Sequence, residues 1–359
     1  MRLSIIISVG LIVCAAPPVQ AQELTNGTFD TTIDGWSPFF DATIVWDSLD
    51  ADGSPGSGSA LVVNARVEAD GATGARQCPG GVVVGELYRF NVDMLIPENQ
   101  SATGRANLVI QWYDDACVEN VGDGIISPGI TTDETGVWRR NSVVSVAPPG
   151  AGSVRVYLNI VKNDQGGTLA AHFDNVSVTP LGRKLTFVPA AGYAAGDGGS
   201  FWVTDLDVNN SGDTAMTYEL WWLPRNVNNL DPIISDSFAL AAGEGRRHSN
   251  VLGEVFGLDP ADAPFGALAV ASDAKRTIAM VRIYNQPRNG GEGTFGQSIP
   301  GVAADEFFGQ HERRRILFMS ENADLRANLG CQKAAGKPLG VQYELFDNSG
   351  VSLYSGHMS

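Results

Sequence analysis

Short runs of alternating apolar and polar residues recur between residues 23 and 179. Three of them, at 88–94, 108–113 and 154–160, carry an apolar side chain at every second position. A period of two is typical of a β-strand that buries one face. Clusters of Gly, Pro, Asn and Asp separate the runs, as at 52–58. This pattern predicts a β-sandwich that covers residues 22–182.

A second β-rich region is predicted from Leu185, where the strand pattern restarts. Within it, the segment 204–221 is echoed by 327–346, with Leu206 matching Leu329 and Tyr218 matching Tyr343. Each copy predicts two strands around a Gly-bearing turn, as in the first hairpin of an immunoglobulin-like sandwich. We therefore expect such a sandwich at 183–309 and a partial second copy at 310–359. Coincidence of a common β pattern is the alternative.

The partial copy has apolar strand faces but lacks a partner sheet. A fragment of this kind is marginally stable alone, and its open edges favour pairing with another chain. Two outcomes stay open. Either the segment docks on the preceding domain, or it is a truncated remnant, so the sequence leaves undecided whether residue 359 is a natural end.

The first 21 residues have the three parts of a secretory signal peptide. Met1 and Arg2 provide a positive start, an apolar run follows to Ala16, and Val19-Gln20-Ala21 supplies small residues for cleavage. A membrane anchor is less compatible, since Pro17-Pro18 ends the run before the roughly 20 residues that a spanning helix needs. Lipidation at Cys14 is disfavoured by the preceding Val13. Export to the periplasm, the cell surface or the medium is therefore predicted.

Export decides how the cysteines are interpreted, because an oxidising compartment allows thiols to pair. Cys78 and Cys117 lie in one predicted domain, each at the end of a strand-like run. We predict a disulfide between them, which stabilises the fold by roughly 3–4 kcal/mol in the chain-entropy model. Cys331 is left over, and its role is open.

Charge and missing motifs exclude several function classes. The chain has 40 acidic and 24 basic side chains and a net charge of −16, which is unfavourable for nucleic-acid binding. No nucleophile elbow, zinc motif, Walker loop or dinucleotide fingerprint occurs, and there are four His. We expect no enzymatic activity. With 42 Gly and 18 Pro and no long stretch of period 3.6, a helical bundle is excluded as well.

The polar faces of the three alternating runs offer a recognition surface. They gather side chains that suit a sugar, because amide and guanidinium groups bond hydroxyls and aromatic rings stack on the C–H face of a pyranose. The expected contacts are Tyr113, Tyr157, Gln111, Asn159, Arg89 and Arg155, with both tyrosines exposed. The alternative is that any solvent-facing sheet is polar.

The N-terminal half also resembles a known family. Residues 24–30 (LTNGTFD), Gly35-Trp36, Tyr88–Phe90, the strand at Trp138 and the closing 173–178 (FDNVSV) are similar to jelly-roll carbohydrate-binding modules of the family 4, 9 and 22 type. The resemblance covers about residues 22–180. It implies a jelly roll that binds glycan across a concave β-face and holds a structural Ca²⁺ near its joined termini.

Carried over by position, that ion would lie at Asp30 and Asp174, with hard oxygen ligands. Capping of local turns by the two aspartates is the alternative. The C-terminal half resembles immunoglobulin-like, β-rich repeat domains of secreted bacterial proteins, which implies no activity.

The expected fold is thus all-β, a jelly roll followed by an immunoglobulin-like sandwich and a truncated copy. The expected function is non-catalytic glycan binding with no membrane span. Two alternatives stay open: a structural or adhesive protein that contacts another protein through its C-terminal half, or an accessory component of a secreted polysaccharide hydrolase.

Overall fold

The computed structural model describes residues 24–122, 124–196, 199–227, 229, 231–274, 276–286, 295–307, 313–316, 331 and 340–358. The predicted signal peptide at 1–21 lies outside them. Strands dominate, and the only α-helix among these residues is the four-residue α1 (Val251–Glu254). The all-β fold class is confirmed. None of the helices in the described ranges has the length and apolarity to cross a bilayer.

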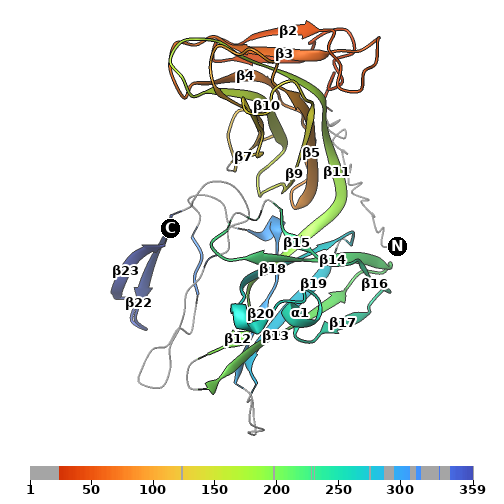
Figure 1. The fold of residues 1–359 in the computed structure, drawn as a ribbon. Coiled ribbons are helices and arrows are strands. Elements are labelled where there is room, and N and C mark those ends of the chain that lie inside the picture. The colour runs from red at the N-terminus through yellow and green to blue at the C-terminus, as the bar shows by residue number, and fades with distance from the viewer. Residues whose placement is uncertain are drawn as a thin grey trace, which may run out of the picture.

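The first sandwich consists of two antiparallel sheets that face one another (Figure 1). One sheet has the order β1 (Ser37–Phe39), β4 (Ala72–Gln77), β10 (Ser153–Lys162), β6 (Gly104–Tyr113) and β7 (Ile125–Ile126), with β8 (Ile130–Thr131) also on β6. The other has the order β9 (Arg139–Val146), β5 (Glu86–Leu95), β11 (Leu169–Gly192), β3 (Ser59–Asn64) and β2 (Thr43–Asp47). The strands β3 to β6 alternate between the two sheets, and so do β8 to β11, as in a jelly roll.

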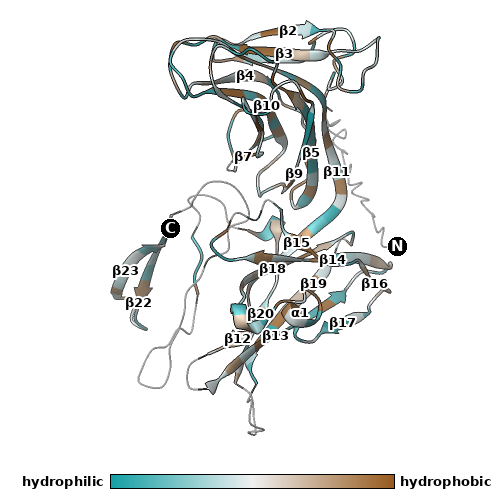
Figure 2. Ribbon diagram, viewed as in Figure 1, coloured by the Kyte–Doolittle hydropathy of each residue, from teal (hydrophilic) through white to brown (hydrophobic). Residues whose placement is uncertain are grey.

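The core lies between these two sheets, on the faces that the alternation predicts. Tyr88, Phe90, Val92 and Met94 of β5 are buried, as are the even-numbered residues Leu108–Trp112 of β6 and Val154–Ile160 of β10. Trp112 packs edge-on against Tyr88 and Phe90, with ring centroids 5.7 and 5.8 Å apart. Figure 2 shows the resulting alternation of hydropathy along the strands.

β11 passes from the first sandwich into the second (Figure 1). Its first half pairs with β3 and β5, and from Lys184 onward it pairs with β18 (Phe265–Ser272). Gly182 has a φ of 64°, and the register with β5 shifts between Pro180 and Lys184. The expected boundary at 182–183 therefore falls inside a continuous strand.

A hydrophobic cluster joins the two sandwiches around β11. Leu87 and Val146 from the first sandwich pack with Phe187, Trp221 and Leu223 from the second. Arg183 of β11 also forms an ion pair with Glu219 of β14 (Met216–Pro224). The junction is buried, so the two sandwiches share apolar packing rather than a flexible linker.

The second sandwich also has two sheets. The C-terminal half of β11 pairs with β18 and β21 (Val302–Ala303), β18 pairs with β14, and β14 pairs with β15 (Ile233–Ile234) and β16 (Phe238–Leu240). The facing sheet contains β12 (Ala194–Ala195), β13 (Phe201–Asn210), β17 (Gly245–His248), β19 (Thr277–Asn285) and β20 (Gly296–Pro300). Short 3₁₀ helices lie at Pro260–Asp262 and Ala304–Glu306.

The expected immunoglobulin-like hairpin at 204–221 is not confirmed. β13 and β14 lie in opposite sheets, so the turn between them is an arch that crosses the core, whereas the first two strands of an immunoglobulin domain share a sheet. The buried Asn210 holds this arch. Its Nδ2 donates to the carbonyls of Thr214 at 2.7 Å and Ala241 at 3.0 Å, and its Oδ1 accepts from Gly212 N at 3.1 Å.

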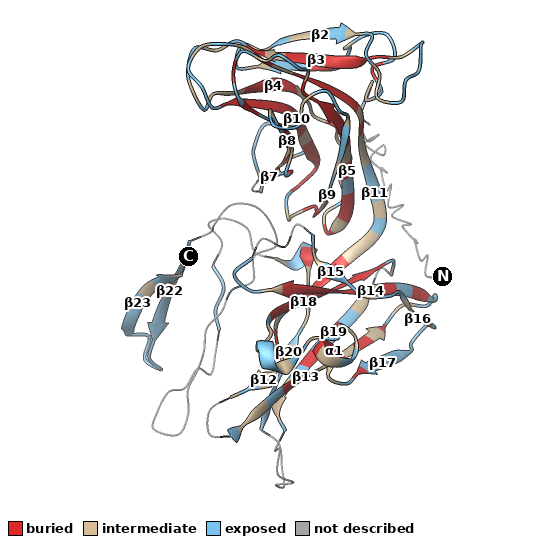
Figure 3. Ribbon diagram, viewed as in Figure 1, coloured by how far each residue is buried: buried red, intermediate tan, exposed pale blue. Residues whose placement is uncertain are grey.

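The end of the described chain forms a separate two-stranded sheet, β22 (Val341–Phe346) with β23 (Ser352–Met358). Its residues are largely exposed (Figure 3), Leu353 by 67% and Phe346 by 57%. Two further strands are expected for the partial copy, at 316–319 and 325–331; apart from Ile316 and Cys331 they lie outside the described residues. The second copy at 310–359 stays a prediction.

Lys162, at the end of β10, is fully buried. Its ammonium group donates to three backbone carbonyls, those of Arg66, Gly166 at 2.7 Å and Gly167 at 3.0 Å. The side chain thus closes the end of the first sandwich, where two loops meet β10.

Replacing Lys162 with Met should lower the free energy of unfolding by about 3–5 kcal/mol, because three carbonyls lose their donor. Urea unfolding followed by tryptophan fluorescence measures this change. The matched control is Lys184→Met, which removes a half-exposed ion pair with Asp305 and should cost under about 1 kcal/mol. Equal losses in the two variants would contradict the structural role of Lys162.

Candidate functional site

The outer face of the sheet β1-β4-β10-β6 brings five of the six expected contact residues together. β10 and β6 pair over ten residues, which places Arg155 beside Gln111 and Asn159 beside Asn107. Tyr157 lies beside Val109 on one side and beside Arg76 of β4 on the other. Tyr113 lies on the same face of β6, two residues after Gln111. We call Tyr113, Tyr157, Gln111, Asn159 and Arg155 the polar face.

Hydrogen bonds connect the side chains of the polar face to each other. The hydroxyl of Tyr157 donates to Gln111 Oε1 at 3.0 Å, and that of Tyr113 reaches the same oxygen at 3.3 Å. Arg155 Nη1 donates to the Tyr113 hydroxyl at 3.0 Å. Asn159 Nδ2 donates to Asn107 Oδ1 at 2.9 Å. The cluster is held in one arrangement before any ligand binds.

The expectation that Tyr113 is exposed is wrong, because its side chain is only 8% exposed. The guanidinium of Arg155 lies 4.0 Å from the centre of its ring and covers it. Burial accordingly raises the pKa of the Tyr113 phenol, and the hydrogen bond with Tyr157 acts in the same direction. Asn159 is also buried. The accessible members are Tyr157, Gln111 and Arg155, which are partly exposed.

Two neighbouring aromatic residues were missed at the sequence level. Phe39 of β1 packs edge-on against Tyr157, with ring centroids 5.2 Å apart, and Phe40 follows it with 66% of its surface exposed. Gly74 of β4 makes room for Phe39, since a Cβ at Gly74 would lie 2.8 Å from that ring. The pair Phe39-Phe40 was the available signal, but it follows no clear alternation.

Arg89 is not brought to the polar face. It lies exposed on β5, where it pairs with Thr179 of β11 and Val144 of β9 in the opposite sheet. Alternation correctly assigns Arg89 to an outward position, but it carries no information on which of the two sheets a strand joins.

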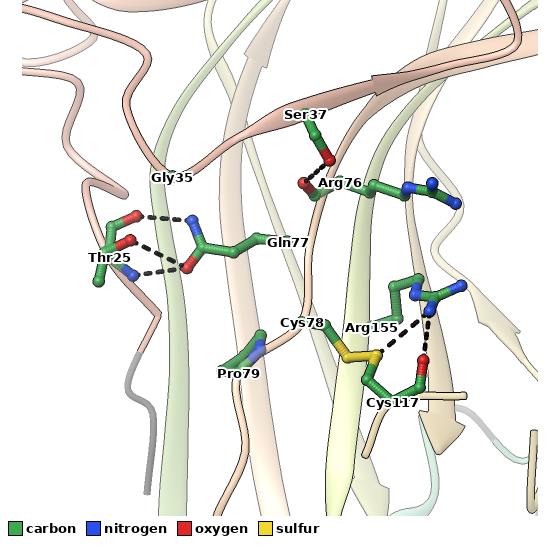
Figure 4. A pocket seen from close by; sticks show the side chains of 9 residues that line it. All are labelled: Thr25, Gly35, Ser37, Arg76, Gln77, Cys78, Pro79, Cys117 and Arg155. Atoms are coloured by element: carbon green, nitrogen blue, oxygen red, sulfur yellow. Dashed lines mark hydrogen bonds between the residues drawn. A yellow bond between two sulfur atoms is a disulfide. The ribbon is translucent and has the colours of Figure 1, made fainter. Parts of the chain in front are cut away.

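A pocket of about 380 Å³ adjoins the polar face (Figure 4). It is lined by Thr25, Gly35, Ser37, Arg76, Gln77, Cys78, Pro79, Cys117 and Arg155. Gln77 closes one side, because its Oε1 accepts from Thr25 N at 2.6 Å and its Nε2 donates to Thr25 O at 2.9 Å. The pocket therefore lies between the N-terminal segment, the end of β4 and the loop after β6.

The predicted disulfide between Cys78 and Cys117 is present, and it forms a wall of this pocket. It ties the end of β4 to the loop after β6, across a separation of 39 residues. Arg155 Nη2 donates to the carbonyl of Cys117 at 2.7 Å. The disulfide thus fixes the loop that in turn orients Arg155. Cys331 is free and exposed.

The carboxylate oxygens of Asp174 and Asp30 already accept hydrogen bonds within the fold. Both oxygens of the buried Asp174 accept backbone amides, from Ala51 at 3.0 Å and Asn175 at 2.7 Å. Asp30 is exposed and accepts from Ser57 Oγ at 3.3 Å. Within the described ranges, no group of three or more acidic, His or Cys residues is arranged to hold a metal. The calcium site stays a prediction.

Burial raises the pKa of Asp174 to about 6, against the two amide hydrogen bonds that lower it, while Asp50 and Asp52 add repulsion. The carboxyl group is therefore easier to protonate than an exposed aspartate. The two amide hydrogen bonds favour a local capping role for Asp174, since they satisfy the amides of Ala51 and Asn175.

Comparisons with known proteins give structural likeness at low identity. A scan against models of protein families matches none of them, and a search of curated proteins finds no match. Among solved structures, the enzymatically active domain of tailspike protein 4 from bacteriophage CBA120 matches with 20% identity and a TM-score of 0.34, over 45% of this chain and 21% of that chain. The match therefore spans about a fifth of the length of that domain.

A single carbohydrate-binding module and a tandem of two such modules are matched as well. The C-terminal family 22 carbohydrate-binding module of Clostridium thermocellum Xyn10B matches with 18% identity and a TM-score of 0.33, over 45% of this chain and 97% of the module. The tandem of two family 22 modules from Paenibacillus barcinonensis Xyn10C matches with 10% identity and a TM-score of 0.33, over 79% of this chain and 96% of the tandem.

Removing the disulfide with Cys78→Ala and Cys117→Ala should lower the free energy of unfolding by roughly 3–4 kcal/mol, because the unfolded chain regains the freedom of the closed loop. Guanidinium unfolding under non-reducing conditions measures this loss. Cys331→Ala is the matched control and should leave stability unchanged. If a reductant leaves the guanidinium concentration at the unfolding midpoint of the wild-type protein unchanged, the predicted stabilisation by the disulfide would be contradicted.

The raised pKa of Asp174 gives a stability dependence on pH. Between about pH 4 and 6, the native protein holds this proton more tightly than the unfolded chain, so its contribution to stability falls as the pH rises. The free energy of unfolding of the wild type minus that of Asp174→Asn should therefore decrease by on the order of 1–3 kcal/mol from pH 4 to 7.

The buried His172 and His248 act in the opposite direction. Burial lowers the pKa of each, so each costs stability as the pH falls below about 6.5. Both are present in the wild type and in the variant, so their effect cancels in the difference. A difference that stays constant or rises with pH would contradict the shifted pKa of Asp174.

Proposed function

We propose that this protein binds glycans, without a chemical step, through the polar face and the adjoining pocket of its first sandwich. The observation that carries the proposal is the cluster of Tyr157, Gln111 and Arg155 on the outside of one sheet. These partly exposed side chains are joined by hydrogen bonds, and Arg155 also lines the adjoining pocket.

The chemistry of the cluster suits a sugar ring. Tyr157 presents an aromatic ring that is supported by Phe39, and such rings pack against the C–H face of a pyranose. Gln111 and Arg155 supply acceptors and donors for hydroxyl groups. Because the side chains are already ordered, little conformational entropy is lost when a ligand binds.

Secretion is part of the same proposal. The disulfide between Cys78 and Cys117 is stable in an oxidising compartment, and the sequence of residues 1–21 has the form of an export signal. A glycan-binding protein outside the cytoplasm would meet polysaccharides there. A role beside a secreted polysaccharide hydrolase stays a prediction of the sequence.

The alternative function, contact with another protein through the C-terminal half, has one supporting observation. The hairpin β22–β23 exposes several apolar side chains, Leu353, Tyr354 and Phe346 among them. Exposed apolar residues that gather on one element are typical of interaction surfaces.

Glycan binding is tested by affinity gel electrophoresis and glycan arrays with the full chain. Tyr157→Ala should raise the dissociation constant at least about tenfold, because the stacking surface and its hydroxyl are lost. Tyr157→Phe, which keeps the ring, should have a smaller effect. Arg89→Ala, on the opposite sheet, is the matched control and should leave affinity unchanged. A folded wild-type protein that binds no glycan would refute the proposal.

A further inference from the structure

Two arginines, Arg76 and Arg155, line the same pocket beside the polar face (Figure 4). Arg76 belongs to β4 and Arg155 to β10, and the strands are paired so that Arg76 lies opposite Tyr157. In Figure 4 both guanidinium groups extend toward the same side of the pocket. The two positive charges therefore come from neighbouring strands and line one pocket.

Neither arginine is neutralised by a carboxylate within the part of the chain that the structure describes. Arg155 contacts neutral groups: the hydroxyls of Tyr113 at 3.0 Å and Tyr157 at 3.5 Å, the carbonyl and Sγ of Cys117 at 2.7 and 3.2 Å, and the face of the Tyr113 ring. The guanidinium of Arg76 has no hydrogen bond or ion pair to a described residue. By contrast, Arg140 and Arg247 each form a two-bond pair with an aspartate.

Both positive charges also act on Tyr113. Although burial raises the pKa of this phenol overall, the positive charges of Arg155 and Arg76 each oppose that rise. The two guanidinium groups thus act on the same hydroxyl. Holding two like charges close together is unfavourable unless an anion lies between them.

We propose that the glycan bound at this site is acidic, and that its carboxylate or sulfate group is bound by Arg76 and Arg155. This inference rests on the proposed function. The planar guanidinium group forms paired hydrogen bonds with carboxylate and sulfate oxygens, which a neutral hydroxyl cannot provide. The disulfide and the Cys117 carbonyl orient Arg155 for this contact, while Arg76 is free to close on the ligand.

The charge of the whole protein limits how acidic the glycan is. At a net charge of −16, the chain repels a polymer that carries a negative charge on every residue. The positive charge of the pocket comes from Arg76 and Arg155, which suffices for a single anionic group. We therefore assign to the site a largely neutral polysaccharide that carries isolated uronic acid or sulfated residues.

The test uses the full chain on an array that contains neutral, uronic acid-bearing and sulfated glycans. The best-bound glycans should carry an anionic group. Chemical reduction of the carboxyl group, or removal of the sulfate, should then raise the dissociation constant at least about tenfold, and the group whose removal does so identifies the anion. Binding of the neutral parent glycan should persist at the weaker level.

Arg76→Gln is the decisive variant, because the wild-type guanidinium has no bond to the described fold whose loss would unfold the protein. It should weaken binding of the acidic glycan about tenfold and binding of the neutral parent far less, because only the anion loses a paired contact. Arg105→Gln is the matched control. Arg105 is an exposed arginine on β6 of the same sheet, beside Val161 rather than the pocket, and its loss should change neither affinity.

The outcomes separate this inference from the proposed function. Equal affinity of the wild type for the acidic glycan and its neutral parent would overturn the acidic ligand and leave glycan binding intact. Equal weakening of both ligands by Arg76→Gln would also overturn it, because Arg76 would then contact the neutral part of the sugar. If the folded protein binds no glycan at all, both proposals fail.

Discussion

The ten-residue antiparallel pairing of β10 with β6 is the constraint on which the first sandwich depends. It sets which side chains enter the core and which form the polar face, and a shift by one residue would exchange the two sets. Both ends of β10 are held in place. Lys162 binds three carbonyls at one end, and at the other the Ser153 hydroxyl donates to the Asp114 carbonyl at 2.7 Å, next to the disulfide loop.

The polar face shows how one set of side chains serves both stability and recognition. Tyr113 is covered by Arg155, and its hydroxyl joins Gln111 and Tyr157, so part of the face is already used within the fold. The part that is left accessible is therefore rigid. For a ligand of many hydroxyls and few apolar atoms, such order reduces the entropic cost of binding.

The second sandwich is joined to the first through a strand and a core. β11 contributes to sheets in both sandwiches, and Phe187 and Trp221 pack with Leu87 and Val146 across the junction. Interfaces between domains of one chain are usually more polar and more mobile than this. The packing implies that the second sandwich holds the first at a defined orientation.

The sequence by itself determined which residues of each strand face the core, since alternation is a local property of the chain. It also determined the all-β class, a β-sandwich in the N-terminal half and the Cys78–Cys117 bond, through strand pattern and the inferred compartment. For the site, it assigned Tyr157, Gln111, Arg155 and Asn159 to one outward face, although Asn159 is buried there. It also placed Tyr113 there, but as an exposed side chain.

Only the tertiary structure decided which strands share a sheet, because that depends on contacts between residues far apart in the chain. It separated Arg89 from the polar face, turned the expected hairpin at 204–221 into an arch held by Asn210, and buried Tyr113 beneath Arg155. It also brought Arg76 to the pocket from a run, 72–77, in which Gly and polar residues obscure the period of two. A local pattern gives the direction of a side chain, whereas its neighbours come from the pairing of distant strands.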